Sequence, residues 1–298
     1  CMESQKAHLI YGLSGLFTSH LILAEDEKAA KELYEDYRFY DKNVYYYPAK
    51  DLLFFQADIH GNLLIRQRMR VIKALLEQKE NITVVTSIDG CMDYLQPLDK
   101  IEKQLIHFRN DSTLDMDKLK DALVHMGYER VGQVEMPGQF SVRGGIVDIY
   151  SLTEENPWRI ELWGDEIDSI RTFDSQSQRS LENLDEIMIY PATEQPAEKG
   201  GVSFLDYFAE KNSLVFLDEP NRLEENARAV EEEFRQSCEN RQQKGEENIS
   251  QNWMCRWEDL NHKLNNRNCI SVSLMEPKRA DWKITEQFNL TIHEFLSE

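Results

Sequence analysis

The chain has 298 residues, which is more than one hydrophobic core usually supports, so we expect two or three packed units. Its 54 Asp and Glu outnumber its 34 Lys and Arg, and the formal net charge is −20. Because non-specific DNA binding needs clustered positive charge, no direct DNA binding is expected, although a local basic patch stays compatible with this balance.

Cysteine spacing and apolar content exclude further classes. The chain has five cysteines, none in a C-x-x-C pair and none with a histidine at ligand spacing: Cys1, Cys91, Cys238, Cys255 and Cys269. We therefore expect reduced thiols, no metal site and no disulfide framework. The sequence has no apolar run long enough to cross a bilayer and no signal peptide, so a cytoplasmic protein is expected. Cys1 ahead of Met2 suggests an excised fragment.

Residues 1–98 alternate short apolar runs with helical stretches, which predicts an α/β unit. Continuous apolar runs between helices are typical of parallel strands that are covered on both faces. The expected strands are 8–13, 20–24, 44–47 and 82–86, and the expected helices are 27–38 and 63–78.

Residues 99–190 have a different pattern, which predicts a smaller α+β unit. An amphipathic helix over 116–126 is followed by alternating segments over 140–150, 158–163 and 169–174. We expect these segments to form antiparallel strands, joined by turns at Gly144-Gly145 and Gly164-Asp165.

The α/β pattern returns in residues 191–298, after a polar, two-proline stretch over 191–201 that indicates a linker or long loop. This third segment contains the apolar stretches 204–208 and 214–217 and a long acidic helix over about 222–243. We therefore expect an α/β parallel-sheet unit built from two chain segments, with a small α+β domain inserted between them.

A loop with the frame of a nucleotide-binding P-loop follows the first expected strand. A P-loop needs G-x-x-x-x-G-K-[ST] after a strand, with glycines for the backbone turn, lysine for the phosphates and a hydroxyl for magnesium. Here Phe17 replaces the second glycine and Thr18 the lysine. We interpret five residues as a degenerate nucleotide loop: Gly12, Gly15, Phe17, Thr18 and Ser19. An ordinary strand-to-helix turn explains the octet equally well.

The acidic pair Asp218-Glu219 is the second candidate remnant of a nucleotide site. Four apolar residues precede it, as in a Walker B strand whose carboxylates hold magnesium. Acidic residues at strand ends are common, so the pair alone favours a solvated strand end. Its position after the Gly12 loop favours ancestry shared with a motor ATPase.

The stretch 136–180, MPGQFSVRGGIVDIYSLTEENPWRIELWGDEIDSIRTFDSQSQRS, resembles the domain shared by the excision-repair protein UvrB and the transcription-repair coupling factors (Mfd). The shared pattern is F-x-V-R-G-G-I-x-D-I-[YF], then P-x-R-I-E, G-D-E-I-x-S-I-R-x-F-D and x-Q-R-S. A weaker similarity extends from the Gly12 loop to Asp218-Glu219.

The resemblance implies a degenerate RecA-like unit, formed by residues 1–98 and 191–298, around an inserted domain at 99–190. In the family this inserted domain is the docking surface for UvrA, the damage-sensing ATPase. The motif match implies that Arg143, Arg159 and Trp163 bind UvrA. Arginine and aromatic side chains are frequent interface hot spots, and guanidinium groups pair bidentately with carboxylates.

The residues by themselves favour internal roles for the same side chains. Arg143 could pair with Asp148 or Asp165, and Trp163 could be a core residue of a small sheet. Strand alternation places Arg159 and Trp163 on one face and the aliphatic residues between them on the other. Because the aliphatic face should be buried, the face with Arg159 and Trp163 is the predicted contact surface.

Two features favour the coupling factors over UvrB. UvrB has a working P-loop, whereas this chain has Thr18 at the lysine position. UvrB also has an aromatic β-hairpin, for which residues 48–63 are too short, even with Phe54-Phe55. The consecutive tyrosines over 45–47 indicate a buried strand rather than a surface that stacks on nucleic acid.

The sequence therefore predicts a non-catalytic, UvrB-mimicking module that recruits UvrA to stalled RNA polymerase for nucleotide excision repair. No catalytic residue and no cofactor are expected in it. ATP and magnesium would serve motor domains that the resemblance implies elsewhere, beside RNA-polymerase-binding and carboxy-terminal domains. The alternatives are an ATP-dependent helicase or UvrB-like damage-binding fragment, and a DNA-binding scaffold.

Overall fold

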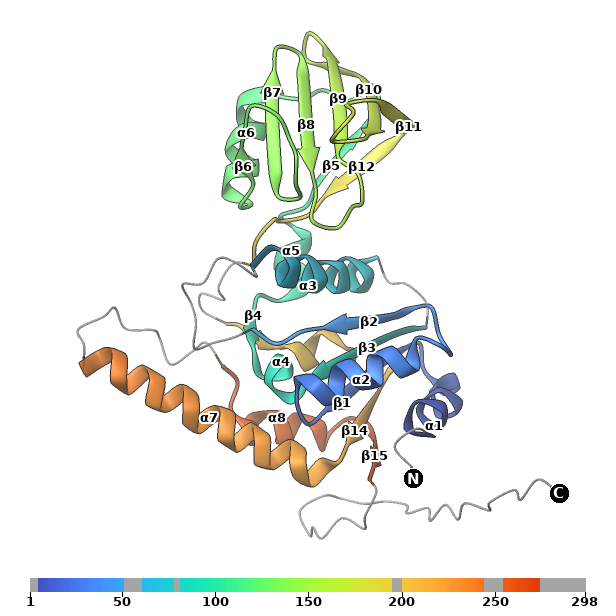
Figure 1. The fold of residues 1–298 in the computed structure, drawn as a ribbon, viewed down its shortest axis with the longest axis vertical. Coiled ribbons are helices and arrows are strands. Elements are labelled where there is room, and N and C mark those ends of the chain that lie inside the picture. The colour runs from blue at the N-terminus through green and yellow to red at the C-terminus, as the bar shows by residue number, and fades with distance from the viewer. Residues whose placement is uncertain (1–4, 51–60, 78–80, 195–199, 244–253, 274–298) are drawn as a thin grey trace, which may run out of the picture. The chain divides into compact units, whose positions relative to one another are not determined.

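The computed structural model describes residues 5–50, 61–77, 81–194, 200–243 and 254–273, which are coloured in Figure 1. The chain divides into two compact units. Unit 1 contains Cys1–Phe55, Gln78–Leu95 and Ala197–Glu298, and unit 2 contains Gln56–Glu77 and Gln96–Pro196. The expected boundary at residue 98 differs from this division, because helix α3 (Gly61–Leu76) belongs to unit 2.

A five-stranded parallel sheet forms the centre of unit 1, as the continuous apolar runs predict. Its order is β15-β14-β1-β3-β2. The strands are β1 (Ser19–Ala24), β2 (Val44–Tyr47), β3 (Ile82–Ser87), β14 (Ser213–Asp218) and β15 (Asn268–Val272). Strand β1 pairs with β14 from Ser19↔Ser213 to Leu23↔Leu217, so segments on both sides of the insertion share one sheet.

Both faces of this sheet are buried. Helices α1 (Lys6–Leu13) and α2 (Glu27–Tyr37) lie against one face, where Ile10 and Leu33 pack with Ile22 and Phe216 (Figure 1). The alternate residue Leu21 points to the other face and is also fully buried. The unit also contains α4 (Ile88–Met92), the β4 (Tyr94–Leu95)–β13 (Val202–Ser203) pair, η3 (Phe204–Tyr207), α7 (Pro220–Gln243) and α8 (Trp257–Leu264).

The strand expected over 8–13 is wrong, because these residues belong to helix α1. A short apolar run fits a strand and a buried helix equally well, and only tertiary packing separates the two. Here Ala7 and Ile10, three residues apart, lie on the same side of the helix and are buried against the sheet.

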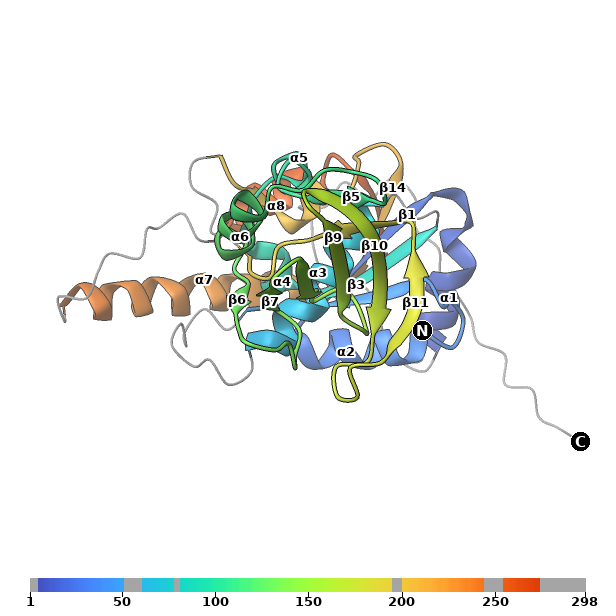
Figure 2. The same cartoon turned by 90° about the horizontal axis from the view of Figure 1, so that it is seen from above.

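A six-stranded sheet forms the centre of unit 2, in the order β11-β10-β9-β8-β7-β6. Its strands are β6 (Glu129–Arg130), β7 (Gln139–Arg143), β8 (Ile146–Tyr150), β9 (Trp158–Trp163), β10 (Glu166–Phe173) and β11 (Ser180–Leu184). From β7 to β11 neighbouring strands are antiparallel, as predicted, and Figure 2 shows β9, β10 and β11 side by side.

One face of this sheet is apolar and the other is charged. Phe140, Val147, Ile160 and Ile170 alternate onto the apolar face and are buried. The other elements of unit 2 are the helices α3, α5 (Leu98–Glu102) and α6 (Met116–His125) and the antiparallel pair of β5 (Ile106–Arg109) and β12 (Glu186–Ile189). The charged face is therefore the one that this sheet presents for other contacts.

Two sequence predictions concern residues outside the described ranges, namely the segment with Phe54-Phe55 and the start of the chain at Cys1. Of the helices that the structure describes, none combines the length and apolar character needed to cross a bilayer. The described residues also contain no cluster of three His, Cys, Asp or Glu side chains suited to a metal ion.

Candidate functional site

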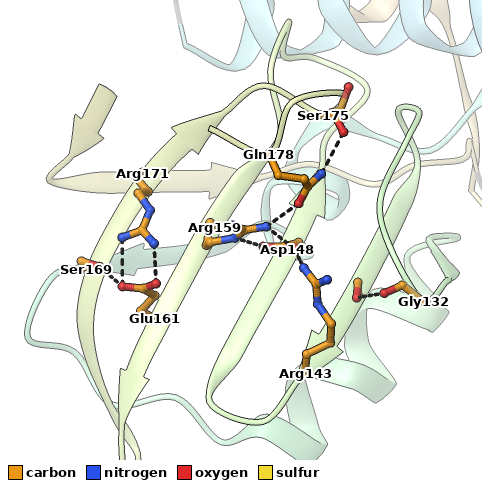
Figure 3. Close-up of polar contacts among 10 residues, drawn as sticks. Gly132, Arg143, Asp148, Arg159, Glu161, Ser169, Arg171, Ser175 and Gln178 are labelled. Carbon is orange, nitrogen blue, oxygen red and sulfur yellow. Dashed lines mark hydrogen bonds and ion pairs between the residues drawn. The ribbon is translucent and has the colours of Figure 1, made fainter. Parts of the chain in front are cut away.

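The charged face of the unit 2 sheet brings the three predicted docking residues onto one surface. Strand register places Asp148 of β8 opposite Arg159 of β9, and Arg143 at the end of the neighbouring strand β7. Trp163 is the last residue of β9, before the turn at Gly164. Strand alternation predicted that Arg159 and Trp163 share a face, and the register of β7, β8 and β9 adds Arg143 to it; Figure 3 shows the two arginines.

Asp148 is the centre of the polar contacts on this face. Its carboxylate is 1% exposed and accepts hydrogen bonds from both arginines. Arg159 donates from Nε to Oδ1 at 2.7 Å and from Nη2 to Oδ2 at 2.8 Å, while Arg143 donates from Nη2 to Oδ2 at 2.6 Å. The bond to Asp148 raises the pKa of the Arg159 guanidinium. One buried carboxylate thus holds two cations.

Arg159 is enclosed, which corrects the expectation that it lies open on the contact surface. Its side chain is 13% exposed, and its guanidinium carbon lies 4.2 Å from the centre of the Phe173 ring. Gln178 accepts a further bond from Arg159 Nη2 at 2.8 Å and donates from Nε2 to the Ser175 carbonyl oxygen at 2.8 Å (Figure 3). The turn after β10 therefore covers this arginine.

Arg143 and Trp163 remain open to a partner. The Trp163 residue is 82% exposed, and the Arg143 side chain is 46% exposed. Trp163 is therefore not the core residue that the sheet position alone favoured. Within the described part of the chain, Arg143 bonds only to Asp148, which leaves its other N–H donors available. Both residues lie at the end of the sheet where the Gly144 and Gly164 turns are found.

A second ion pair on the same face was not predicted from the sequence. Arg171 of β10 donates to both Glu161 oxygens, and the bond from Nη1 to Oε2 is 2.9 Å long. Ser169 donates to Glu161 Oε2 at 3.2 Å. The bond from Arg171 lowers the pKa of Glu161. The register of the β9–β10 hairpin, Ser169↔Glu161, brings these side chains together, and only that register could have revealed the pair.

The predicted nucleotide loop does not have the surroundings of a P-loop. It lies between helix α1 and strand β1, with the short helix η2 (Ser14–Leu16) inside it, whereas a P-loop joins a strand to a following helix. Gly12 belongs to α1 and Ser19 is the first residue of β1. Phe17 is partly buried against the core instead of making room for a phosphate.

The loop and the acidic pair also lie at opposite ends of the sheet. Ser19 pairs with Ser213 at the amino end of β14, whereas Asp218 is the last residue of that strand. Five residues of extended chain separate these ends by roughly 16 Å. The two candidate remnants therefore do not meet in one phosphate pocket.

Asp218 of the acidic pair is buried and has an internal counter-ion, so the pair is not a solvated strand end. Lys6 Nζ, at the start of α1, lies 2.7 Å from Asp218 Oδ1 and 3.5 Å from Glu219 Oε1. The side chains of Lys6 and Asp218 are 6% and 8% exposed. Burial raises the pKa of Asp218, and Lys6 counteracts part of that rise.

Further carboxylates follow the neighbouring strands at the same end of the sheet. Asp26 and Glu27 come after β1, and Asp89 comes after β3. Burial and the nearby Glu27 raise the pKa of Asp89 to about 6. In open parallel sheets ligands bind at the carboxyl ends of the strands, and here that end is acidic.

Comparison with known proteins identifies relatives of both units. Residues 106–194 match the UvrB interaction domain family. The chain is 38% identical over 217 residues to a transcription-repair-coupling factor of Bacillus subtilis, which is 66% of this chain and 18% of that protein. It is 37% identical over 151 residues, 51% of this chain, to the coupling factor of Staphylococcus haemolyticus, of which it covers 13%. The chain thus spans less than a fifth of the length of these relatives.

Proposed function

We propose that this chain, a relative of the transcription-repair coupling factors with a UvrB interaction domain, is a non-catalytic module that recruits UvrA. In this proposal unit 2 provides the docking face for UvrA, and the longer protein brings that face to stalled RNA polymerase. Nucleotide excision repair would begin where transcription has stopped. The coupling-factor relatives support the repair context, and the geometry of the charged face supports the docking role.

The observation that carries the proposal is the open pair of Trp163 and Arg143. The Trp163 residue is 82% exposed at the end of β9, so its indole is accessible to a partner. Tryptophan and arginine are also the residues most enriched at the energetic centres of protein interfaces. Because Trp163 has two side-chain torsions, it loses little conformational entropy on binding.

The charge of the face fits an acidic partner. Residues 106–194 contain eighteen Asp and Glu against eight Lys and Arg, so the matched domain is acidic as a whole. On the charged face, by contrast, the side chains that bond to one another are three arginines, Asp148 and Glu161, and the exposed Glu166 lies opposite Trp163. The half-exposed Arg143 is the cation that this face offers to an acidic partner.

The proposed lack of catalysis rests on unit 1. Lys6 neutralises Asp218 of the acidic pair that follows β14 as a Walker B pair would, and Glu27 and Asp89 follow the carboxyl ends of β1 and β3. The Gly12 loop lies at the other end of the sheet. We therefore propose that the chain uses no ATP, magnesium or other cofactor.

Binding to purified UvrA tests the recruitment role. The chain is immobilised and titrated with UvrA, with Trp163→Ala and Arg143→Ala beside the wild type. Each variant should raise Kd by about tenfold or more, because each removes a hot-spot side chain. Val124→Ala on helix α6 of the same unit and Phe39→Ala in unit 1 are the controls, since these residues are 58% and 85% exposed and neither lies in the six-stranded sheet. Their Kd should stay within about twofold of the wild type.

Two results would refute the docking proposal. One is a wild-type chain that does not bind UvrA, and the other is a Trp163→Ala variant that binds as tightly as the Val124→Ala control. Calorimetry with MgATP tests the absence of catalysis separately. Saturable binding of ATP to the chain would favour the ATPase alternative.

A further inference from the structure

We propose that Asp148 positions Arg143 on the docking face and that the partner supplies a carboxylate to the open donors of Arg143, on the same face as Trp163. The inference rests on the proposed docking role and adds separate roles for its residues. Trp163 and Arg143 contact the partner, whereas Asp148 and Arg159 hold Arg143 in place.

The charges around Asp148 indicate which group the partner would supply to Arg143. Glu161 and Arg171 neutralise each other. Arg143 and Arg159 share the single carboxylate of Asp148, so one positive charge is left without a counter-ion among these residues. Because Arg159 is enclosed and Arg143 is half exposed, this excess reaches the surface at Arg143. A carboxylate of the partner would balance it.

The hydrogen bonds define which residue positions which. Arg159 is held by both oxygens of Asp148, by Gln178 and by the Phe173 ring, so it fixes the carboxylate as well as itself. Asp148 then receives Arg143 through Nη2 alone. The remaining donors of the Arg143 fork stay open for a carboxylate, and guanidinium groups bind such acceptors bidentately. Arg143 is therefore oriented before the partner arrives.

Asp148→Asn separates positioning from simple charge balance, because the two explanations predict opposite changes in Kd for UvrA. The variant adds one positive charge to the face, so tighter binding to an acidic partner is expected if Asp148 only neutralises charge. If Asp148 positions Arg143, the loosened guanidinium must be ordered on binding and Kd rises. We expect Kd for UvrA to rise by about fivefold to tenfold, mainly through faster dissociation.

Matched variants keep the test decisive. Glu186→Gln is the control, since Glu186 also joins two basic side chains, with bonds of 3.0 Å from His107 and 2.7 Å from Arg109, but on the separate β5–β12 pair. Gln178→Ala loosens Arg159 without changing any charge and should raise Kd by about twofold to threefold. Thermal unfolding of each variant will show whether it folds. If Asp148→Asn does not fold, Gln178→Ala replaces it in the test.

A double-mutant cycle tests whether Asp148 acts through Arg143. In the Arg143→Ala background, Asp148→Asn, or Gln178→Ala in its place, should change Kd by less than about twofold, because the residue being positioned is gone. An undiminished effect in that background would contradict the inference, as would tighter binding of a folded Asp148→Asn variant. So would unchanged binding of both folded variants.

The salt dependence of binding tests the partner's carboxylate. Arg143→Ala should flatten the rise of Kd with salt concentration, whereas Trp163→Ala should weaken binding without changing that slope. An equal slope for Arg143→Ala and the wild type would mean that no partner charge lies at Arg143. These outcomes differ from failure of the docking role itself, in which the wild type would not bind UvrA or Trp163→Ala would have no effect.

Discussion

Replacing Lys6 tests whether an internal ion pair holds the carboxyl end of the unit 1 sheet. In Lys6→Met the aliphatic stem is kept, but the ammonium group 2.7 Å from Asp218 is removed. Because both side chains are more than nine-tenths buried, the variant leaves an uncompensated carboxylate inside the protein. Breaking such a pair from one side destabilises a protein by about 3–5 kcal/mol. We expect the free energy of unfolding in urea to fall by an amount in this range near pH 7.

Two further variants and the pH dependence sharpen that test. Lys6→Met combined with Asp218→Asn removes both charges and should recover most of the loss. In Lys6→Met the buried Asp218 can take up a proton, so the loss should shrink as pH is lowered. Lys28→Met removes the partner of Glu32 from a pair whose side chains are 83% and 67% exposed, and it should change stability by less than about 1 kcal/mol. If Lys6→Met loses no more than Lys28→Met, the ion pair does not support the fold.

Three further predictions concern stability. Burial raises the pKa of Asp89 to about 6, so the folded chain holds this proton more tightly than the unfolded chain, and the resulting stabilisation is lost as pH rises from about 4 through 6. Asp89→Asn should remove this pH dependence and raise stability at pH 7 by up to about 3 kcal/mol, and urea unfolding at each pH checks this. Gly127 has φ +87° and a Cβ there would lie 2.4 Å from Thr193 Cγ2, so Gly127→Ala should lower stability by about 1–3 kcal/mol in thermal unfolding. Gly144 has φ +59° but open space around it, so Gly144→Ala should lose only about 1 kcal/mol, and equal losses at both glycines would show that steric contact with Thr193 is unimportant.

The fold could be predicted where a pattern had one physical explanation. The expected strands over 20–24 and 44–47 match β1 and β2 closely, because continuous apolar runs between helices fit a parallel sheet covered on both faces. The run over 8–13 was ambiguous, because its composition suits a buried strand as well as a helix. The contact that fixes α1, between Lys6 and Asp218, joins residues more than two hundred positions apart. No local pattern contains that information.

The candidate site could be predicted only in part for a related reason. Alternation along β9 placed Arg159 and Trp163 on one face, and the regular strand from Trp158 to Trp163 agrees with it. Alternation does not show whether a turn covers that face. The turn after β10 brings Gln178 over Arg159 and leaves Trp163 exposed, so two residues of one strand face differ in their access to a partner. That difference depends on the conformation of the turn, where Gln178 itself has φ +59°.

The internal pairing of Arg143 and Arg159 does not argue against docking. An arginine that is free in solution has about 2 kcal/mol of side-chain entropy to lose when it binds. Asp148 restricts Arg143 before a partner arrives, while most of its donors stay open, so less entropy is lost on association. The free energy needed to order Arg143 and to bury the Asp148 carboxylate is instead part of the folding of the domain. Two guanidinium groups compensate the buried carboxylate there. A face that was all exposed arginine would bind acidic surfaces of many shapes. A single oriented guanidinium and one exposed indole on the same face restrict binding to a partner with a carboxylate and an apolar pocket at matching positions.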